Sequence, residues 1–262
     1  MTALELIARL RELGVKISVD ADELLVDAPQ GVITPELAAQ IRERKIQIIA
    51  MLKWSARSQR SSDLPLVAAD RDQSLPLSYA QQRLWFLDQL EPDSSAYNIS
   101  WTVRLKGELE VPALQQALNA LVQRHEVLRS CFPTVAGQAE LHLRDDVIVP
   151  LEKSELQGAT DERLRAHLSR LAAQPFELAK PPLIRVFLVQ RTATEHVLLV
   201  LIHHIVSDGA SMRILFRELA QLYDAAVAGN LAAGLSRLSP LDIQYPDFSL
   251  WQREWLSGEQ LQ

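Results

Sequence analysis

The sequence predicts an α/β (α+β) protein built from two parts: a small helix–hairpin–helix unit, and a larger unit in which helices and strands mix. Two observations predict this fold class. Residues 1–54 change from helical to alternating apolar periodicity and back again. Residues 182–227 carry two apolar strands, a histidine pair and an amphipathic helix in immediate succession. A polar stretch at 55–74, rich in Ser, Arg and Asp, separates the parts and predicts a linker that is at least partly flexible.

Composition excludes several classes of protein. The 262 residues are 48% hydrophobic and 23% charged, as in ordinary globular proteins. The net charge of −6 argues against nucleic acid as a partner, because phosphate binding requires a basic surface. Cys131 is the single cysteine, so no internal disulfide can form. The N-terminus has no signal-peptide pattern, and the longest apolar run, Val197 to Ile202, is too short to span a membrane. We therefore expect a cytoplasmic protein without a membrane partner.

The first unit is expected to open with a helix that Thr2 and Glu5 cap and Gly14 ends. The apolar face of this helix consists of Leu6, Ile7, Leu10 and Leu13. Alternating apolar residues then predict a hairpin, which turns at Asp20 to Asp22. The residues that alternate are Val15, Ile17 and Val19, then Leu24 and Val26 less regularly.

Thr34-Pro35-Glu36 predicts the start of another helix, with proline in its first turn. The apolar face of this helix, which runs to about Lys53, consists of Leu37, Ile41, Ile48 and Leu52. A lone two-stranded hairpin leaves two open edges, and an open edge can accept a strand from another chain. The residues alone favour a solvated edge and a binding edge equally.

The second unit is expected to begin with a helix after the N-cap Ser78. Packing of an amphipathic helix accounts for its apolar side chains, but it leaves Gln81 and Arg83 unexplained. A second helix runs through VPALQQALNALVQRHEVLRSCF, with Leu114, Leu118, Leu121 and Val122 on its apolar face. It is expected to end in the charged residues Arg124, His125, Glu126 and Arg129.

Two strands joined at Thr-Ala-Thr follow, and the second ends at His203 and His204. The continuous apolar run before them is typical of a strand covered on both faces. Ser-Asp-Gly then turns the chain, and a helix is expected from Ser211, with Ile214, Leu215, Leu219 and Leu222 on its apolar face.

Three interpretations compete for the histidine pair. A metal site is disfavoured, because adjacent side chains of a strand point to opposite faces and cannot easily share one ion. A structural pair and a catalytic histidine remain equally favoured by the residues alone. In the catalytic interpretation one ring acts as a base or positions a reactant, Asp208 organises the turn, and the Gly209 N–H meets a developing oxyanion.

The first unit resembles a known family. ELIARLRELGVKISVDADELLVDAPQGVITPELAAQIRERK is similar to the tubulysin-type N-terminal docking domain of nonribosomal peptide synthetases. The resemblance implies that residues 1–54 receive a short C-terminal peptide from an upstream synthetase along one edge strand. That strand consists of Glu23, Leu24, Leu25, Val26, Asp27 and Ala28. Lys16 and Arg44 are candidate charged contacts, and the sequence leaves open whether the docking domain pairs with itself.

The second unit resembles the condensation domains of the same synthetases. HHIVSDGAS is similar to their HHxxxDG motif, and three further segments match in the same order: SYAQQRLWFL, RHEVLRSCF and YPDFSLWQREW. The resemblance implies a chloramphenicol-acetyltransferase-like fold of two lobes around a tunnel, of which residues 75–262 form the N-terminal lobe. Motifs of the second lobe are absent from this sequence, so we expect no useful condensation by this chain alone.

The resemblance also implies the chemistry. Donor and acceptor arrive on the 4'-phosphopantetheine arms of two carrier proteins, so the chain itself binds no cofactor and no metal. His204 matches the catalytic histidine, and His203 a structural one. Asp208 is implied to pair with Arg124, and Gly209 to give flexibility. The sequence departs from the motif at Ile202 and Ala210, where methionine and a large residue are common.

Two alternatives remain open. An ester-forming relative would carry the same motifs, whereas an epimerisation domain would not follow a docking domain and a cyclising relative lacks the paired histidines. The chain could also serve only as an interaction module. The sequence does not show which amino acids are joined, the stereochemistry of the donor or the upstream partner.

Overall fold

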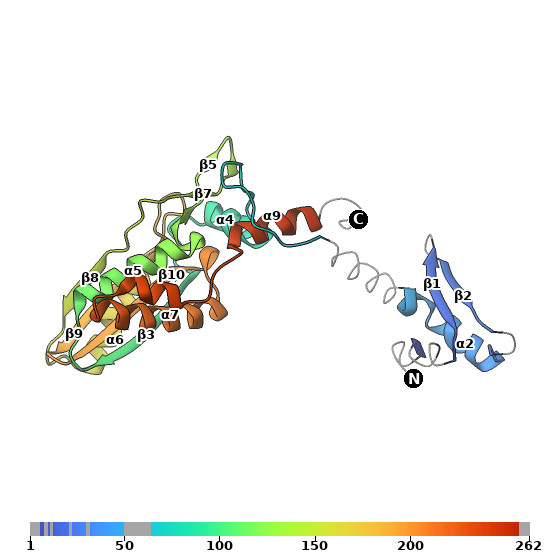
Figure 1. The fold of residues 1–262 in the computed structure, drawn as a ribbon, viewed down its shortest axis with the longest axis horizontal. Helices are drawn as coiled ribbons and strands as arrows, with labels where there is room; N and C mark the ends of the chain where they lie inside the picture. Colours follow the sequence, from blue (N-terminus) through green and yellow to red (C-terminus); the bar gives the residue numbers. More distant parts are fainter. Residues whose placement is uncertain are drawn as a thin grey trace. The chain divides into compact units, whose positions relative to one another are not determined.

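The computed structural model divides into two compact units, Met1–Pro65 and Leu66–Gln262. It describes residues 6–7, 10, 13–20, 23–29, 32–49 and 64–256. The predicted cap residues Thr2 and Glu5, and Leu52 at the end of the second predicted helix, lie outside these ranges. Each unit has its own hydrophobic core and is described by itself (Figure 1).

The first unit has the predicted order of elements. Gly14 has φ +71° and Val15 N–H donates to Leu10 C=O at 2.9 Å, so the first helix ends at the glycine, as the sequence predicts. Strands β1 (Lys16–Asp20) and β2 (Glu23–Asp27) form an antiparallel hairpin in which Ser18 is opposite Leu25.

Helix α2 (Pro35–Glu43) begins at the N-cap Thr34, whose hydroxyl accepts from Leu37 N–H. The sequence predicts one helix to about Lys53, but α2 ends at Glu43 with Arg44 as its C-cap, and a further helical stretch covers 45–49. The turn keeps Ile41 and Ile48 in the same core. The buried members of that core are Leu6, Ile7, Leu10, Val15, Leu37, Ile41 and Ile48.

The second unit is built on a four-stranded sheet of order β3-β10-β9-β8. Its strands are β3 (Asn98–Lys106), β10 (Glu195–His203), β9 (Ile184–Thr192) and β8 (Leu151–Glu155). β10 pairs antiparallel with both of its neighbours, whereas β8 and β9 are parallel. From His196 to its end, β10 is buried, as its continuous apolar run predicts.

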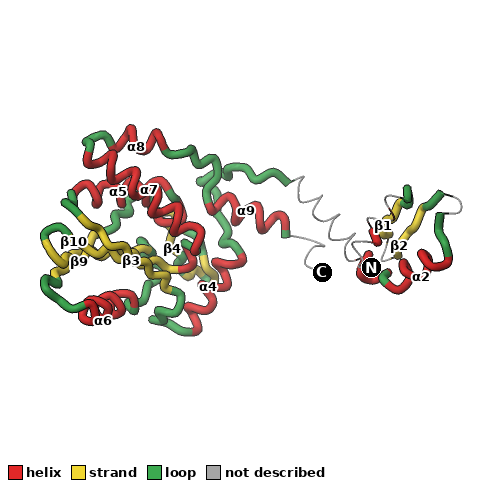
Figure 2. Tube along the Cα trace, turned by 90° about the horizontal axis from the view of Figure 1, so that it is seen from below, coloured by secondary structure: helices red, strands yellow, loops and turns green. Residues whose placement is uncertain are grey.

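Helices cover both faces of this sheet (Figure 2). Helices α5 (Val111–Arg124) and α7 (Gly209–Val227) lie on one face, with α8 (Leu231–Arg237) beyond them, and α6 (Asp161–Ala172) lies on the other. On the α6 face, Leu164 packs against Val189 and Val197. The result is a three-layer α/β unit. Its strand β10, which lies between β3 and β9, ends at the histidine pair at one end of the sheet.

Four further short elements surround that end. They are α4 (Tyr79–Leu90), α9 (Tyr245–Trp255) and the 3₁₀ turns η1 (Glu126–Arg129) and η2 (His204–Val206). The sequence predicts one helix through 111–132, but α5 ends at Arg124 and Glu126–Arg129 forms η1. Two small hairpins lie outside the sheet: β4 (Ser130–Cys131) with β7 (His142–Leu143), and β5 (Thr134–Val135) with β6 (Gln138–Ala139).

Part of the predicted linker belongs to the second unit. Residues 66–74 are included in its compact body, and Arg71 lies close to Asp247 and Glu126. The ion pairs of Arg71 explain why this polar stretch folds against the unit. Across the part of the chain that the structure describes, no helix is long and apolar enough to cross a membrane.

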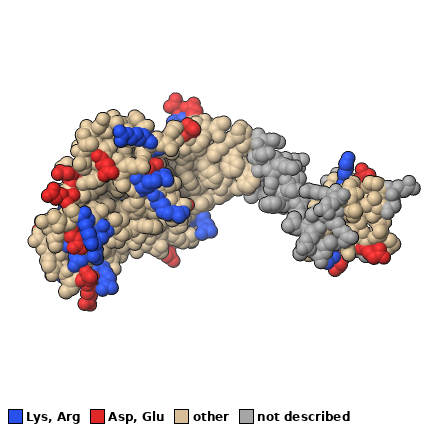
Figure 3. Space-filling model, turned by 60° about the horizontal axis from the view of Figure 1, so that its bottom comes forward, with Lys and Arg blue, Asp and Glu red and all other residues tan. Residues whose placement is uncertain are grey.

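The surface of the second unit mixes the two signs of charge. On the face that Figure 3 shows, Lys and Arg side chains lie among Asp and Glu side chains. Opposite charges are also paired on this unit: Arg191 lies 2.9 Å from Asp161 and 3.6 Å from Glu195, and Glu195 also lies 3.5 Å from Arg104. Ion pairs open to solvent contribute little to stability.

Candidate active site

The end of β10 places two adjacent histidines in opposite environments. The His203 N–H donates to Leu183 C=O at 3.0 Å, and the His204 N–H donates to Tyr97 C=O at 2.9 Å. Their backbone is thus held by the residues that directly precede the two neighbouring strands, β9 and β3, and successive side chains point in opposite directions. His203 is only 2% exposed, whereas His204 is exposed. One ring therefore faces the core and the other faces solvent.

The His203 ring hydrogen-bonds to the backbone two residues further along the chain. Its Nδ1 accepts a hydrogen bond from Ile205 N–H at 3.2 Å, so this nitrogen carries no proton. The ring packs near Tyr97 and Phe176, with centroids 6.3 and 6.1 Å away. Burial, together with the neighbouring His204, lowers the pKa of His203 from 6.5 to about 4. His203 is therefore a neutral, structural residue at pH 7.

This burial predicts an acid-sensitive fold. Between pH 6.5 and about 4 the unfolded chain protonates His203 and the folded chain does not, so the free energy of unfolding falls as the pH drops through this window. The full effect is about 3 kcal/mol. We expect His203→Asn, whose side-chain oxygen can still accept from Ile205 N–H, to flatten the profile. Urea unfolding at a series of pH values measures it, and an unchanged slope in the variant would contradict the assignment.

The exposed ring of His204 has a defined tautomer. Its Nδ1 lies 2.8 Å from the backbone oxygen of Ser207. A carbonyl oxygen can only accept, so the hydrogen of the neutral ring is on Nδ1. The Nε2 atom then has a free lone pair, and it can take a proton or hydrogen-bond an amine.

An open pocket of about 230 Å³ lies beside His204. Its walls come from α4, η1, η2, the start of α7 and Tyr245 at the start of α9. The four sequence motifs therefore meet at one place in the fold. A larger depression of about 490 Å³, lined in part by Asp88, Phe176 and Arg185, includes neither His203 nor His204 among its lining residues.

Asp208 and Gly209 begin the helix next to the pocket. Asp208 is the N-cap of α7, and its Oδ1 accepts from the Ser211 hydroxyl at 2.6 Å and the Ser211 N–H at 2.7 Å. These hydrogen bonds lower the pKa of Asp208 below its ordinary value. A Cβ on Gly209 would meet no atom within 4 Å, so the structure leaves open space at this position.

Arg124 does not pair with Asp208, so the predicted salt bridge is wrong. The Arg124 Nε donates to Glu218 Oε2 at 3.1 Å, and a terminal nitrogen of Arg124 donates to Ser239 C=O. Glu218 is 5% exposed and also lies 2.7 Å from His125 Nε2. A buried carboxylate needs a charged partner more than the solvent-facing cap Asp208 does, which explains why Arg124 bonds to Glu218.

Comparison with known proteins identifies the second unit. The family model "Condensation domain" matches residues 71–262. The chain belongs to the condensation-domain family. The family model "TubC N-terminal docking domain" matches residues 4–53, so the condensation domain is preceded by a docking domain.

Two synthetases and one solved structure are among the relatives of this condensation domain. Malpinin synthetase from Mortierella alpina is 39% identical over 263 residues, which cover 100% of this chain and 3% of that protein. Bacitracin synthase 2 from Bacillus licheniformis is 33% identical over 254 residues, or 97% of this chain and 9% of that protein.

The solved structure concerns condensation domain-mediated chain release from the enacyloxin polyketide synthase. It has a TM-score of 0.69 and 26% identity, and the match covers 99% of this chain and 48% of that chain. The chain thus spans a small part of the synthetases and about half of the solved domain.

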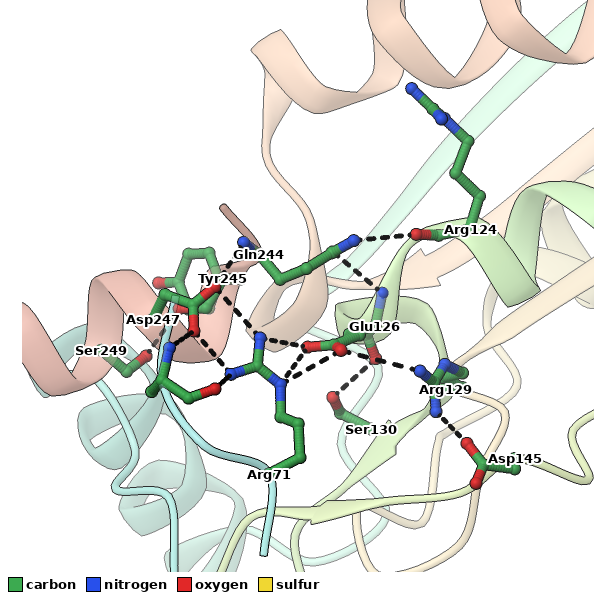
Figure 4. Close-up of polar contacts among 11 residues, drawn as sticks. Arg71, Arg124, Glu126, Arg129, Ser130, Asp145, Gln244, Tyr245, Asp247 and Ser249 are labelled. Atoms are coloured by element: carbon green, nitrogen blue, oxygen red, sulfur yellow. Dashed lines mark hydrogen bonds and ion pairs between the residues drawn. The ribbon is translucent and has the colours of Figure 1, made fainter. Parts of the chain in front are cut away.

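A partly buried ion-pair network joins three segments of the condensation domain (Figure 4). The Asp247 carboxylate accepts four hydrogen bonds: from Arg71 Nη1 at 2.6 Å, Arg71 Nη2 at 3.0 Å, Ala69 N–H at 2.9 Å and Gln244 N–H at 2.7 Å. Arg71 Nε also donates to both oxygens of Glu126 at 3.1 and 3.0 Å. The network ties the predicted linker to η1 and α9 beside the pocket.

The ionisation of this network follows from its contacts. Burial alone would raise the pKa of Asp247, but the hydrogen bonds from Arg71, Ala69 and Gln244 outweigh burial and lower it. The bond to Asp247 in turn raises the pKa of Arg71. Both groups are therefore charged across the ordinary pH range. Sequence reasoning missed Arg71 because its segment has the composition of a linker.

The docking domain has an edge strand close to the predicted place, but β2 ends at Asp27 and does not include Ala28. In the described residues β2 pairs with β1 alone. Leu24 packs towards the core, whereas Leu25 is 48% exposed and Val26 is 39% exposed. Lys16 is exposed opposite Asp27, and Arg44 forms a 2.7 Å ion pair with its neighbour Glu43. Two apolar side chains on an open strand are unusual for a surface that contacts only water.

Proposed function

We propose that this chain is part of a peptide-forming synthetase, and that its condensation domain joins two carrier-bound substrates. Both substrates are thioesters on 4'-phosphopantetheine arms of partner carrier proteins. The acceptor amine attacks the donor carbonyl, the new C–N bond forms, and the C–S bond breaks. The amine proton is transferred to the departing thiolate, which leaves as the thiol.

The single observation that carries this proposal is the free Nε2 of His204 beside a pocket formed by all four motifs. In this position the ring can hydrogen-bond the attacking amine and take its proton as the C–N bond forms. The Gly209 N–H is the first of α7, where the helix dipole favours negative charge. We assign it to the developing oxyanion.

The experiment that tests the proposal is a single-turnover assay on the complete synthetase. Donor and acceptor carriers are loaded, mixed with the enzyme and followed by intact mass. We expect the donor acyl group to appear on the acceptor carrier as an amide. If only an acceptor carrying an alcohol is acylated, the domain forms esters and the amide proposal is wrong. If neither acceptor is acylated, the chain is better regarded as an interaction module.

We further propose that the docking domain binds the C-terminal peptide of an upstream synthetase as an added strand along β2. Main-chain hydrogen bonds would supply affinity, while Leu25 and Val26 provide apolar contact. Lys16 and Arg44 are the candidate contacts for acidic residues of the peptide.

Strand addition predicts a sharp effect of proline. Leu25→Pro removes an N–H from the hairpin, so we expect peptide affinity to fall at least ~100-fold, the loss of about 3 kcal/mol. Fluorescence anisotropy with a labelled upstream C-terminal peptide measures this. Leu25→Ala keeps the backbone and serves as the matched variant, for which we expect a loss of no more than about tenfold. Equal affinity of Leu25→Pro and the wild type would rule out binding at this strand.

A further inference from the structure

We propose that Gln81 is a positioning residue for His204, acting through the peptide group of Ile205. The sequence leaves Gln81 unexplained, because amphipathic packing of α4 does not require an amide there. Its role in catalysis rests on the proposed function of the condensation domain, but its effect on the His204 ring does not. The two can therefore be tested separately.

Both halves of the Gln81 amide are used inside the protein. Gln81 is 1% exposed. Its Oε1 accepts from Ser78 N–H at 3.1 Å, which closes the capping box of α4. Its Nε2 donates to Ile205 C=O at 3.3 Å. Only a group with one acceptor and one donor at its end can make both bonds, and glutamine is the uncharged side chain of this length that has them.

The carbonyl that Gln81 holds belongs to Ile205, the residue directly after His204. Ile205 N–H is bound by His203 Nδ1 and Ile205 C=O by Gln81, so both sides of this residue are fixed. Two residues later, the Ser207 carbonyl accepts the hydrogen of His204 Nδ1. The direction of that carbonyl depends on the η2 turn. Releasing Ile205 C=O therefore frees the group that fixes the tautomer of His204.

The bond to Ile205 has no part in capping the helix. The capping box needs only the Gln81 oxygen, and Ser78 Oγ supplies its other half by accepting from Gln81 N–H at 3.2 Å. The amide nitrogen instead reaches a turn 124 residues away in sequence. Gln81 also lines the His204 pocket, so the contact lies at the site of the chemistry.

Because the amide oxygen caps α4 and the amide nitrogen binds Ile205 C=O, variants can separate the two hydrogen bonds. Gln81→Glu keeps the oxygen that accepts from Ser78 N–H, but it places a second acceptor against Ile205 C=O. The hydrogen bond to Ile205 is therefore replaced by repulsion between two oxygens. Gln81→Met keeps the length and removes both bonds. Ser78→Ala removes the other half of the capping box, together with the 3.0 Å contact between Ser78 Oγ and the Tyr245 hydroxyl, and leaves both amide bonds of Gln81 intact. Gln89→Glu adds the same charge to the exposed surface of α4 and serves as the matched control.

The first readout is the ring tautomer of His204, taken from long-range ¹H–¹⁵N spectra of this chain at mildly alkaline pH. We expect a single Nδ1–H tautomer in the wild type, Ser78→Ala and Gln89→Glu. We expect mixed tautomers in Gln81→Glu and Gln81→Met. A purely structural role for Gln81 would lower thermal stability in these two variants and leave the tautomer unchanged.

The second readout is turnover by the complete synthetase. We expect Gln81→Glu to lower kcat about 10- to 100-fold with KM changed less than about threefold, because a misplaced base affects the chemical step. If both Gln81 variants retain the pure Nδ1–H tautomer of His204, the inference is overturned. If the wild-type synthetase forms no amide, the proposed function fails and the ring spectra alone decide the inference.

Discussion

Asp247→Ala is expected to destabilise the condensation domain by about 3 kcal/mol. Its carboxylate accepts four hydrogen bonds, which use all four lone-pair sites, and its side chain is 1% exposed. Removing it leaves the N–H groups of Ala69 and Gln244 without this acceptor, and leaves Arg71 with Glu126 as its remaining carboxylate. Equilibrium unfolding in urea, followed by tryptophan fluorescence, measures the loss.

Two further variants make this result specific. Asp247→Asn has the same shape, but its NH₂ group faces donors that need an acceptor, so we expect it to be nearly as destabilising. Lys180→Ala removes an exposed ion pair with Glu177, whose side chains are 74% and 60% exposed. We expect it to change stability by less than about 0.5 kcal/mol. Equal effects of Asp247→Ala and Lys180→Ala would contradict a central role for the network.

His204→Ala in the complete synthetase is expected to slow amide formation about 10²- to 10⁴-fold, the usual contribution of a general base. The ring is exposed, and among the described residues it bonds only through Nδ1, so its removal should leave the fold of the domain unchanged. Single-turnover kinetics with loaded carriers measure the rate. The melting temperature of the variant shows whether the fold is retained.

The matched control is another exposed histidine. His142 has a side chain 46% exposed and lies 3.0 Å from Glu140, away from the pocket. His142→Ala is therefore expected to retain the wild-type rate. A loss of less than about fivefold in His204→Ala would show that this ring is not the base.

Local sequence signals predicted the elements that carry the site. The Ser78 N-cap, the helix end at Gly14 and the buried strand before His203 all lie where the sequence predicts them. These features depend on residues a few positions apart, such as the Ser78 hydroxyl and the Gln81 N–H that donates to it. A short stretch of sequence is therefore enough to predict them. The sequence also predicts that the histidine pair lies at a strand end. Successive side chains of a strand point to opposite faces, and the rings of His203 and His204 do so here.

The partners of polar and charged side chains that are far apart in sequence cannot be predicted in this way. Arg71 and Asp247 are 176 residues apart, and Gln81 and Ile205 are 124 apart, so no local pattern joins them. The resemblance to condensation domains implies that Arg124 pairs with Asp208, but Arg124 bonds to Glu218, because the buried carboxylate has the greater need of a charged partner. The sequence shows that α7 follows the histidines, but not which of its side chains reaches α5.

The two adjacent histidines have different roles: His203 stays neutral and accepts a backbone hydrogen bond, while His204 presents an unprotonated Nε2 to the pocket. A pH titration of both rings in the wild-type chain, followed by long-range ¹H–¹⁵N spectra, tests this directly. We expect His203 to carry its hydrogen on Nε2 and to stay neutral down to about pH 4, while neutral His204 carries its hydrogen on Nδ1. A His203 that protonates near its ordinary pKa of 6.5, or a His204 with its hydrogen on Nε2, would contradict it.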